Sequence, residues 1–111
     1  MTTDALDLMP AELISEMPRL YDQDGKGKDA IVHAHLFGPV GDFYLTEVDA
    51  EGEVGFGYTM LSAHPDGAEL GYIHLSELQG VVSTFKQTKD LRYLIERDLH
   101  WTPCPLKEVM A

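Results

Sequence analysis

Apolar and polar positions follow strand-like patterns in four stretches of the chain, separated by Gly, Pro and Asp. The four predicted strands are residues 30–37, 42–49, 54–61 and 69–75. The connectors between them are short enough for hairpins, whereas parallel pairing would need long crossovers. We therefore expect an antiparallel meander in which the strands pair in sequence order, 1-2-3-4.

Helical spacing occurs before and after these strands. Residues 10–17 predict a short helix, because Pro10 suits a first turn and Leu13, Ile14 and Met17 form one apolar stripe. Pro18 should end it. A second short helix is expected to open at residues 76–78, and Gly80 is expected to weaken or end it.

The remaining C-terminal part has weaker patterns. Residues 86–90 predict a polar, flexible loop, and residues 91–99 fit either a helical turn or a strand. From Thr102 the tail should be extended, with a last turn from Leu106. The fold class expected is α+β, a four-stranded antiparallel meander sheet with an N-terminal helix and a C-terminal helical or extended segment packed on it.

Composition narrows the class of protein. The 111 residues fit a single domain over positions 1–111, and an apolar content of 44% is that of a globular chain. Nineteen acidic residues face eight Lys and Arg, which gives a net charge of −11. Direct binding to nucleic acid or to an anionic membrane is therefore not expected. The acidity serves solubility, or it lets one face imitate DNA toward a DNA-binding protein, and both readings stay open.

Several motifs that the sequence lacks bear on the localisation and the chemistry of the protein. The N-terminal stretch is acidic where a secretory signal would be basic, and no stretch approaches the ~18–20 apolar residues of a spanning helix, so a cytoplasmic protein is expected. Cys104 stands alone and is expected to be structural or incidental. No phosphate loop, nucleophile elbow or cofactor motif is present. No cofactor is predicted, and whether the protein is an enzyme stays open.

Two patterns suggest metal ions, although neither is favoured. Residues 22–33 resemble a calcium loop, but Lys26 stands where an oxygen ligand is needed. His33 and His35 on one strand would point to the same face about 6–7 Å apart, with Glu47 or His74 as a third ligand. A polar surface with two histidines is the simpler interpretation.

Two further features have a structural and a binding interpretation. Gly55 and Gly57 lie on either side of Phe56 in the third strand. In the structural interpretation a bulky residue of a helix packs across the two glycines, and in the binding interpretation a ligand approaches the backbone there. Arg97 lies between Ile95 and Leu99 and should be buried with a carboxylate of Glu47, Glu69 or Asp24, unless it receives an anion. The structural interpretation is favoured in both cases.

A series of motifs in order along the chain resembles one bacterial family, catalogued as domain of unknown function 2958. The resemblance covers about residues 13–109 and rests on Leu20-Tyr21, Asp24-Gly25-Lys26-Gly27, Phe37-Gly38-Pro39, Thr46-Glu47, Phe56-Gly57, Glu69-Leu70-Gly71-Tyr72, Leu75-Ser76-Glu77-Leu78 and Ile95-Glu96-Arg97-Asp98-Leu99. It implies a small stand-alone domain, often carried on plasmids, integrated elements and phages, without an established activity. It implies an accessory role and supplies no catalytic residues.

The function expected is that of a non-enzymatic accessory or protein-binding domain with an unidentified protein partner. The candidate binding residues are Asp24, Lys26, Glu47, Glu69, Tyr72 and Arg97. The alternative is a small metal-binding protein or enzyme that uses His33 and His35, with Glu47 and His74 as further ligands. The oligomeric state is not predicted.

Overall fold

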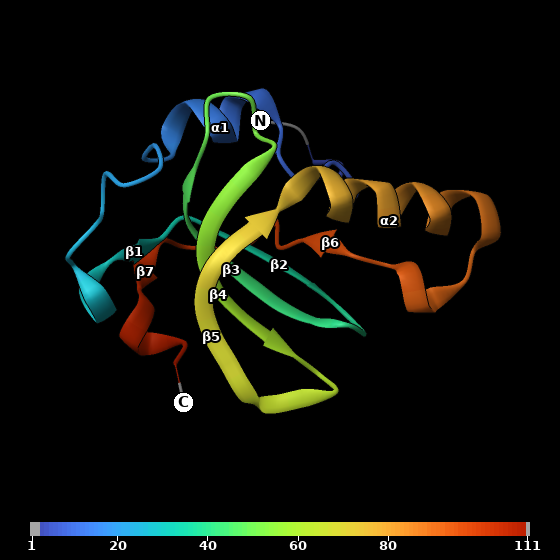
Figure 1. Ribbon diagram of the computed structural model, residues 1–111. Coiled ribbons are helices and arrows are strands. Elements are labelled where there is room, and N and C mark those ends of the chain that lie inside the picture. The colour runs from blue at the N-terminus through green and yellow to red at the C-terminus, as the bar shows by residue number, and fades with distance from the viewer. Residues whose placement is uncertain (1–2, 111) are drawn as a thin grey trace.

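A computed structural model describes residues 3–110 and places one five-stranded antiparallel sheet at its centre, in the order β5-β4-β3-β2-β6 (Figure 1). The strands are β2 (Ala34–Gly38), β3 (Gly41–Val48), β4 (Val54–Leu61), β5 (His64–His74) and β6 (Glu96–Arg97). The predicted α+β class and the sequential pairing of the four long strands are confirmed.

The first predicted strand divides in two at His33. Its first part, β1 (Ile31–Val32), leaves the main sheet and pairs with β7 (Cys104–Pro105) in a small second sheet. Its second part, β2, carries the fifth strand on its outer edge, where Leu36 pairs with Arg97. The prediction of four strands was therefore one strand short, because the two residues of β6 are too few to show a period in the sequence.

The second helix is longer than predicted. It runs as α2 (Leu75–Thr88), through Gly80 and into the stretch predicted to be a loop. Leu75 and Val82 are buried on it, and this packing outweighs the roughly 1 kcal/mol that a glycine costs inside a helix. The helix ends at Lys89, whose φ of 58° is left-handed.

The other short elements follow the predictions. Helix α1 (Ala11–Glu16) lies within the predicted residues 10–17. The ambiguous residues 91–99 contain both a helical turn, η2 (Leu91–Tyr93), and the strand β6. The tail is extended and then turns at η3 (Leu106–Glu108), while η1 (Gly27–Asp29) precedes β1. Within residues 3–110, no helix is long and apolar enough to span a bilayer.

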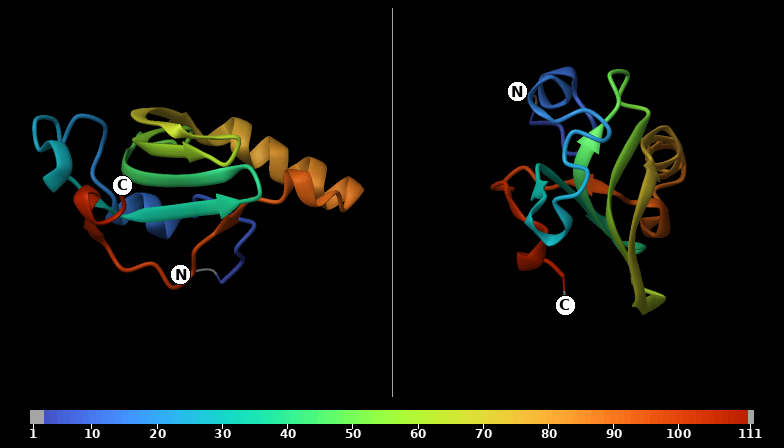
Figure 2. Two further views of the ribbon diagram at one scale, coloured as in Figure 1. Left: turned by 90° about the horizontal axis from the view of Figure 1, so that it is seen from below. Right: turned by 60° about the vertical axis from the view of Figure 1, so that its left-hand side comes forward.

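The two faces of the sheet are covered by different parts of the chain. One face packs on α1, α2 and the segment before α1, around Leu36, Leu45, Leu75 and Val82. The other face packs on the C-terminal segment, around Val32, Tyr58 and Leu106. In the right-hand view of Figure 2, α2 and the C-terminal end accordingly lie on opposite sides of the sheet.

A β-bulge after Leu45 changes which face the end of β3 presents. Leu45 pairs with Gly57, but Glu47 pairs with Phe56, so one extra residue is inserted in β3. Side chains alternate along a strand, so this insertion turns Glu47 to the face of Phe56 and returns Val48 to the helix-covered core. The bulge therefore decides that the carboxylate of Glu47 faces away from the helices.

The two glycines of β4 lie where β3 comes close. A Cβ at Gly57 would overlap the carbonyl oxygen of Tyr44, and a Cβ at Gly55 would lie 2.6 Å from Leu45 and 3.3 Å from Leu75. Leu75 is the first residue of α2, so the packing of a helix residue across the glycines is confirmed at Gly55. Gly57 instead accommodates the backbone of the neighbouring strand.

Candidate functional site

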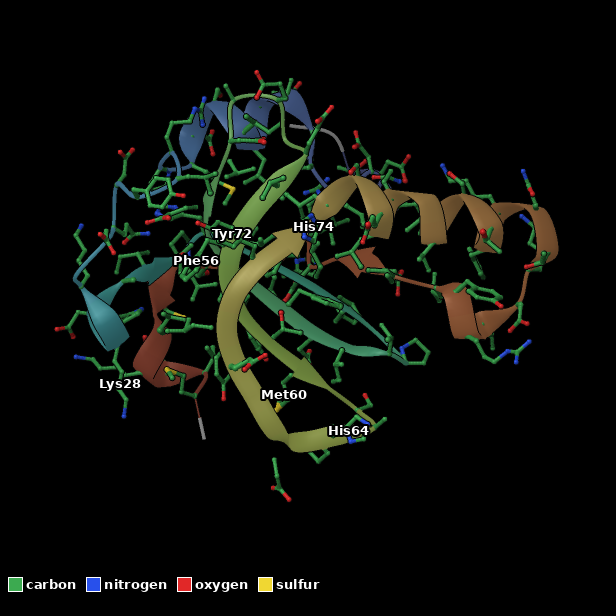
Figure 3. All side chains as sticks on the ribbon, in the orientation of Figure 1. Lys28, Phe56, Met60, His64, Tyr72 and His74 are labelled. Carbon is green, nitrogen blue, oxygen red and sulfur yellow. The ribbon has the colours of Figure 1, made fainter. Side chains whose placement is uncertain are left out.

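A pocket of about 380 Å³ opens on the face of the sheet that the helices leave uncovered. One wall is the segment of residues 20–30, the floor is β3, β4 and β5, and Leu106 of η3 also lines the pocket. The side chains that line it include Tyr21, Asp24, Glu47, Phe56, Leu70 and Tyr72. We refer to it as the Glu47 pocket. Figure 3 shows Phe56 and Tyr72 side by side on β4 and β5, with Lys28 on η1 beyond them.

Glu47 connects the wall of this pocket to its floor. Its side chain is buried, and its Oε1 and Oε2 accept hydrogen bonds of 2.8 and 2.7 Å from the backbone amides of Tyr21 and Gln23. Each carboxylate oxygen of Glu47 therefore has a backbone N–H as partner. The bulge and the turn at residues 20–25 thus hold an acidic group at the base of the pocket.

Gln23 fixes the same wall through its side chain. Its amide nitrogen donates to the carbonyl oxygens of Ile31 (2.9 Å) and Thr46 (2.8 Å), and its Oε1 accepts from the amide of Ile31 at 2.7 Å. Gln23 is buried, its hydrogen bond to Thr46 is buried as well, and its two hydrogen bonds with Ile31 are partly buried. The turn is therefore held in a defined position against β1 and β3, and its shape is set before any ligand arrives.

Tyr21 and Tyr72 meet at the mouth of the pocket. Their hydroxyl oxygens are 2.7 Å apart, and the ring of Tyr72 packs edge-on against Phe56 at 5.5 Å between centroids. Tyr21 has φ of 74°, a left-handed conformation that is costly for an aromatic residue. The hydrogen bond to the Tyr21 hydroxyl raises the pKa of Tyr72, and the negative charges of Glu47 and Asp24 raise it further.

The charged side chains that line the pocket are all acidic. Its lining side chains, all within residues 3–110, include the acids Asp24 and Glu47 and no Lys, Arg or His. The other lining groups are aromatic or aliphatic, apart from Gln23, Thr46 and glycines. Such a surface can hold an apolar group, a hydrogen-bond donor or a cation, and it opposes an anion.

Three of the six candidate binding residues come together here, namely Asp24, Glu47 and Tyr72. Lys26 lies between the lining residues Gly25 and Gly27, and Glu69 precedes the lining residue Leu70 on β5, but neither side chain lines the pocket. Arg97 lies on β6, at the opposite edge of the sheet from β5.

Arg97 is buried, as predicted, but the expected ion pair with Glu47, Glu69 or Asp24 is wrong. Its Nε donates to the carbonyl oxygen of Asp7 at 3.0 Å and its guanidinium to that of Asp4 at 3.3 Å, while its backbone amide donates to Ala5 at 2.7 Å. The physical reason is that Glu47 bonds to the turn amides, and the N-terminal segment offers carbonyl acceptors beside β6. Arg97 therefore fastens the N-terminal segment.

His35 lies between two carboxylates on the other half of this sheet face. Its Nε2 is 2.8 Å from Asp42 and its Nδ1 is 3.2 Å from Asp98, and its ring stacks on Tyr44 at 4.6 Å. Burial alone would raise the pKa of Asp98, but the hydrogen bonds with His35 and with the amide of His100 outweigh it and lower that pKa.

The residues of the alternative metal site lie apart. His33 falls between β1 and β2, where burial lowers the pKa of its imidazole, while His74 lies at the far end of β5 and Glu47 in the pocket. Across residues 3–110 no three His, Cys, Asp or Glu side chains are grouped to hold a metal ion. Burial, with Glu108 nearby, raises the pKa of the Cys104 thiol, which disfavours the reactive thiolate.

Sequence reasoning did not select Tyr21, Gln23, Phe56 or Leu70 as parts of one site. Gln23 lies in a polar, glycine-rich stretch that predicts a solvated loop, and nothing local shows that its amide is buried. Tyr21 and Tyr72 are aromatic residues that lie next to Asp22 and Gly71, and this pattern is the signal that could have pointed to both. Their contact spans 51 positions and depends on the tertiary fold.

Comparison with curated proteins and with solved structures gives no match. A family model does match, over residues 8–107 of the chain, and it includes every residue that lines the Glu47 pocket. The chain belongs to this family, which is described as protein of unknown function (DUF2958).

Proposed function

We propose that this protein is a non-enzymatic accessory domain that binds another protein through the Glu47 pocket and the neighbouring face of β5. The observation that carries the proposal is the exposure of large apolar side chains around the pocket mouth. Tyr21 is 66% exposed, Tyr72 53% and Leu70 41%. Aromatic side chains grouped around a concavity are typical anchors of protein interfaces.

The position of β5 supports the same role. It is an edge strand of eleven residues, and most of its side chains are exposed. An edge strand carries backbone groups that can pair with an extended segment of another chain. A partner that pairs there would also reach Leu70 and Tyr72, which project from β5 into the pocket.

The net charge of −11 favours a partner with a basic surface, because opposite charge speeds the encounter and excludes acidic competitors. It argues against direct contact with nucleic acid or with an anionic membrane. The single cysteine fits a cytoplasmic setting. The carriage on mobile elements that the family resemblance implies fits a domain that modulates another protein.

Co-purification from the native host tests the proposal. The tagged wild-type protein should retain a stoichiometric protein partner, whereas Tyr72→Ala and Leu70→Asp should retain much less. Tyr93→Ala is the matched control, since Tyr93 is a partly exposed tyrosine of η2, outside the pocket lining. Recovery of no stoichiometric partner with the wild type, or equal recovery with all variants, would contradict the proposal.

A further inference from the structure

The Glu47 pocket combines a buried negative charge with aromatic walls. Glu47 is only 5% exposed and nevertheless lines the pocket. Each of its oxygens accepts one hydrogen bond from a turn amide, whereas a carboxylate has about four acceptor sites. The oxygens of Glu47 can therefore accept further hydrogen bonds at the base of the pocket. In such buried surroundings a negative charge without a positive partner is costly.

Asp24 adds a second carboxylate at the wall. The two basic residues of the same loop, Lys26 and Lys28, do not line the pocket, and Lys107 pairs with Asp29 at 3.3 Å outside it. None of these three lysines lines the pocket. A positively charged group entering the pocket would meet Asp24 and Glu47 without a competing cation among the lining side chains.

Three aromatic rings complete the surroundings. Phe56 and Tyr72 are in edge-to-face contact, and Tyr21 is joined to Tyr72 through the hydroxyl groups. The faces of aromatic rings attract cations, and the attraction is strongest where water is excluded. Carboxylates together with such rings recognise an organic cation on an apolar stem better than a neutral or an anionic group.

We propose that the Glu47 pocket receives a lysine or arginine side chain of the partner protein, with the apolar stem against Phe56, Leu70 and Tyr72 and the cationic end toward Glu47 and Asp24. This inference rests on the proposed function, which it deepens by naming what the pocket recognises. The volume of about 380 Å³ lies in the range of small-ligand pockets and admits either long side chain.

The test is a titration of the isotope-labelled full chain, followed by the backbone amide signals in NMR spectra. The probes are N-acetyl-lysine amide and N-acetyl-arginine amide, with N-acetyl-norleucine amide as the neutral control of similar shape. At least one cationic probe should shift the amides of Tyr21, Gln23 and Gly25 saturably, and norleucine should shift them much less. Raising the salt to about 0.5 M should weaken the effect.

Variants separate recognition from folding. Asp24 and Tyr72 are exposed, so Asp24→Asn and Tyr72→Ala should stay folded and weaken cation binding by about fivefold or more. Asp66→Asn, an exposed acid of β5 outside the pocket lining, should leave binding unchanged. Equal shifts by norleucine, or no loss in Asp24→Asn and Tyr72→Ala, would overturn the inference. If the cationic probes do not bind but co-purification depends on Tyr72, the protein-binding role stands and the recognition of a cationic side chain is wrong. If the cationic probes bind but no partner co-purifies, the pocket recognises a cation and the protein-binding role is wrong.

Discussion

The carboxylate of Glu47 accepts a hydrogen bond of 2.7 Å from the backbone amide of Gln23, which lies 24 positions earlier in the chain. This bond and its neighbour from Tyr21 join the turn at residues 20–25 to the bulge of β3. One acidic residue therefore shapes the pocket and supplies part of its charge. The stability of the fold and the chemistry of the pocket are linked at this position.

Replacement of Glu47 by alanine should destabilise the protein clearly. It removes one buried and one partly buried hydrogen bond to a charged group and leaves the amides of Gln23 and Tyr21 without their acceptor, which costs about 2–3 kcal/mol. Urea unfolding followed by circular dichroism measures the change. Glu77→Ala, an exposed acid in the first turn of α2, is the control and should shift the midpoint only slightly. Equal small shifts would show that the carboxylate does not hold the turn.

Gly57 of β4 and Gly71 of β5 are paired across the two strands and should respond very differently to replacement by alanine. Gly57→Ala places a methyl group against the carbonyl of Tyr44 and should cost about 3 kcal/mol. Gly71→Ala meets nothing within 4 Å and should be neutral or stabilise by up to about 1 kcal/mol. Thermal unfolding of the two variants makes the comparison. A tolerated Gly57→Ala would mean that β3 and β4 do not approach as described.

Arg97→Ala should lower the urea midpoint, whereas Arg92→Ala should barely move it. Arg97 is buried and donates to the carbonyl oxygens of Asp7 and Asp4, so its loss removes both hydrogen bonds, takes this donor from the Asp7 carbonyl and costs about 2–4 kcal/mol. Arg92 is exposed and pairs with Asp90 at the surface, where ion pairs contribute little. Similar midpoints for the two variants would place Arg97 at the surface.

The stability that Asp98 contributes should depend on pH. Its pKa is lowered from 3.8 in the folded chain, so the contribution is present above pH 3.8 and is lost as the pH falls through the folded-state value. Wild type should exceed Asp98→Asn by about 1 kcal/mol or less near neutral pH and lose this advantage in acid. Urea midpoints of both proteins across that range provide the measurement. A difference that grows in acid would have the wrong sign.

The meander could be predicted because the sequence patterns that specify its strands and hairpins lie within short stretches of the chain. Burial alternates at the start of β4, over residues 54–57, and the connectors are too short for anything except hairpins. Helix α2 could not be bounded in the same way. Gly80 reads as a helix terminator, yet Leu75 and Val82 hold the helix on the sheet, and this tertiary packing has no local signature.

The pocket was only partly predictable, for a different reason. Asp24, Glu47 and Tyr72 stood out by residue type, but the face that Glu47 presents depends on one inserted residue after Leu45. A strict alternation would send Glu47 to the helix-covered face and Val48 to the pocket. Since a bulge is set by the pairing of two strands, the sequence of one strand does not disclose it.

Site-specific photocrosslinking tests the central claim, that the Glu47 pocket is a protein-binding site, most directly. A photoreactive phenylalanine derivative at position 72 lies at the pocket mouth, and the same group at position 93 lies on η2, outside the pocket lining. In the native host, irradiation should give a discrete covalent adduct with one partner protein from position 72 and none from position 93. Absence of an adduct at position 72, or the same adducts from both positions, would contradict the account.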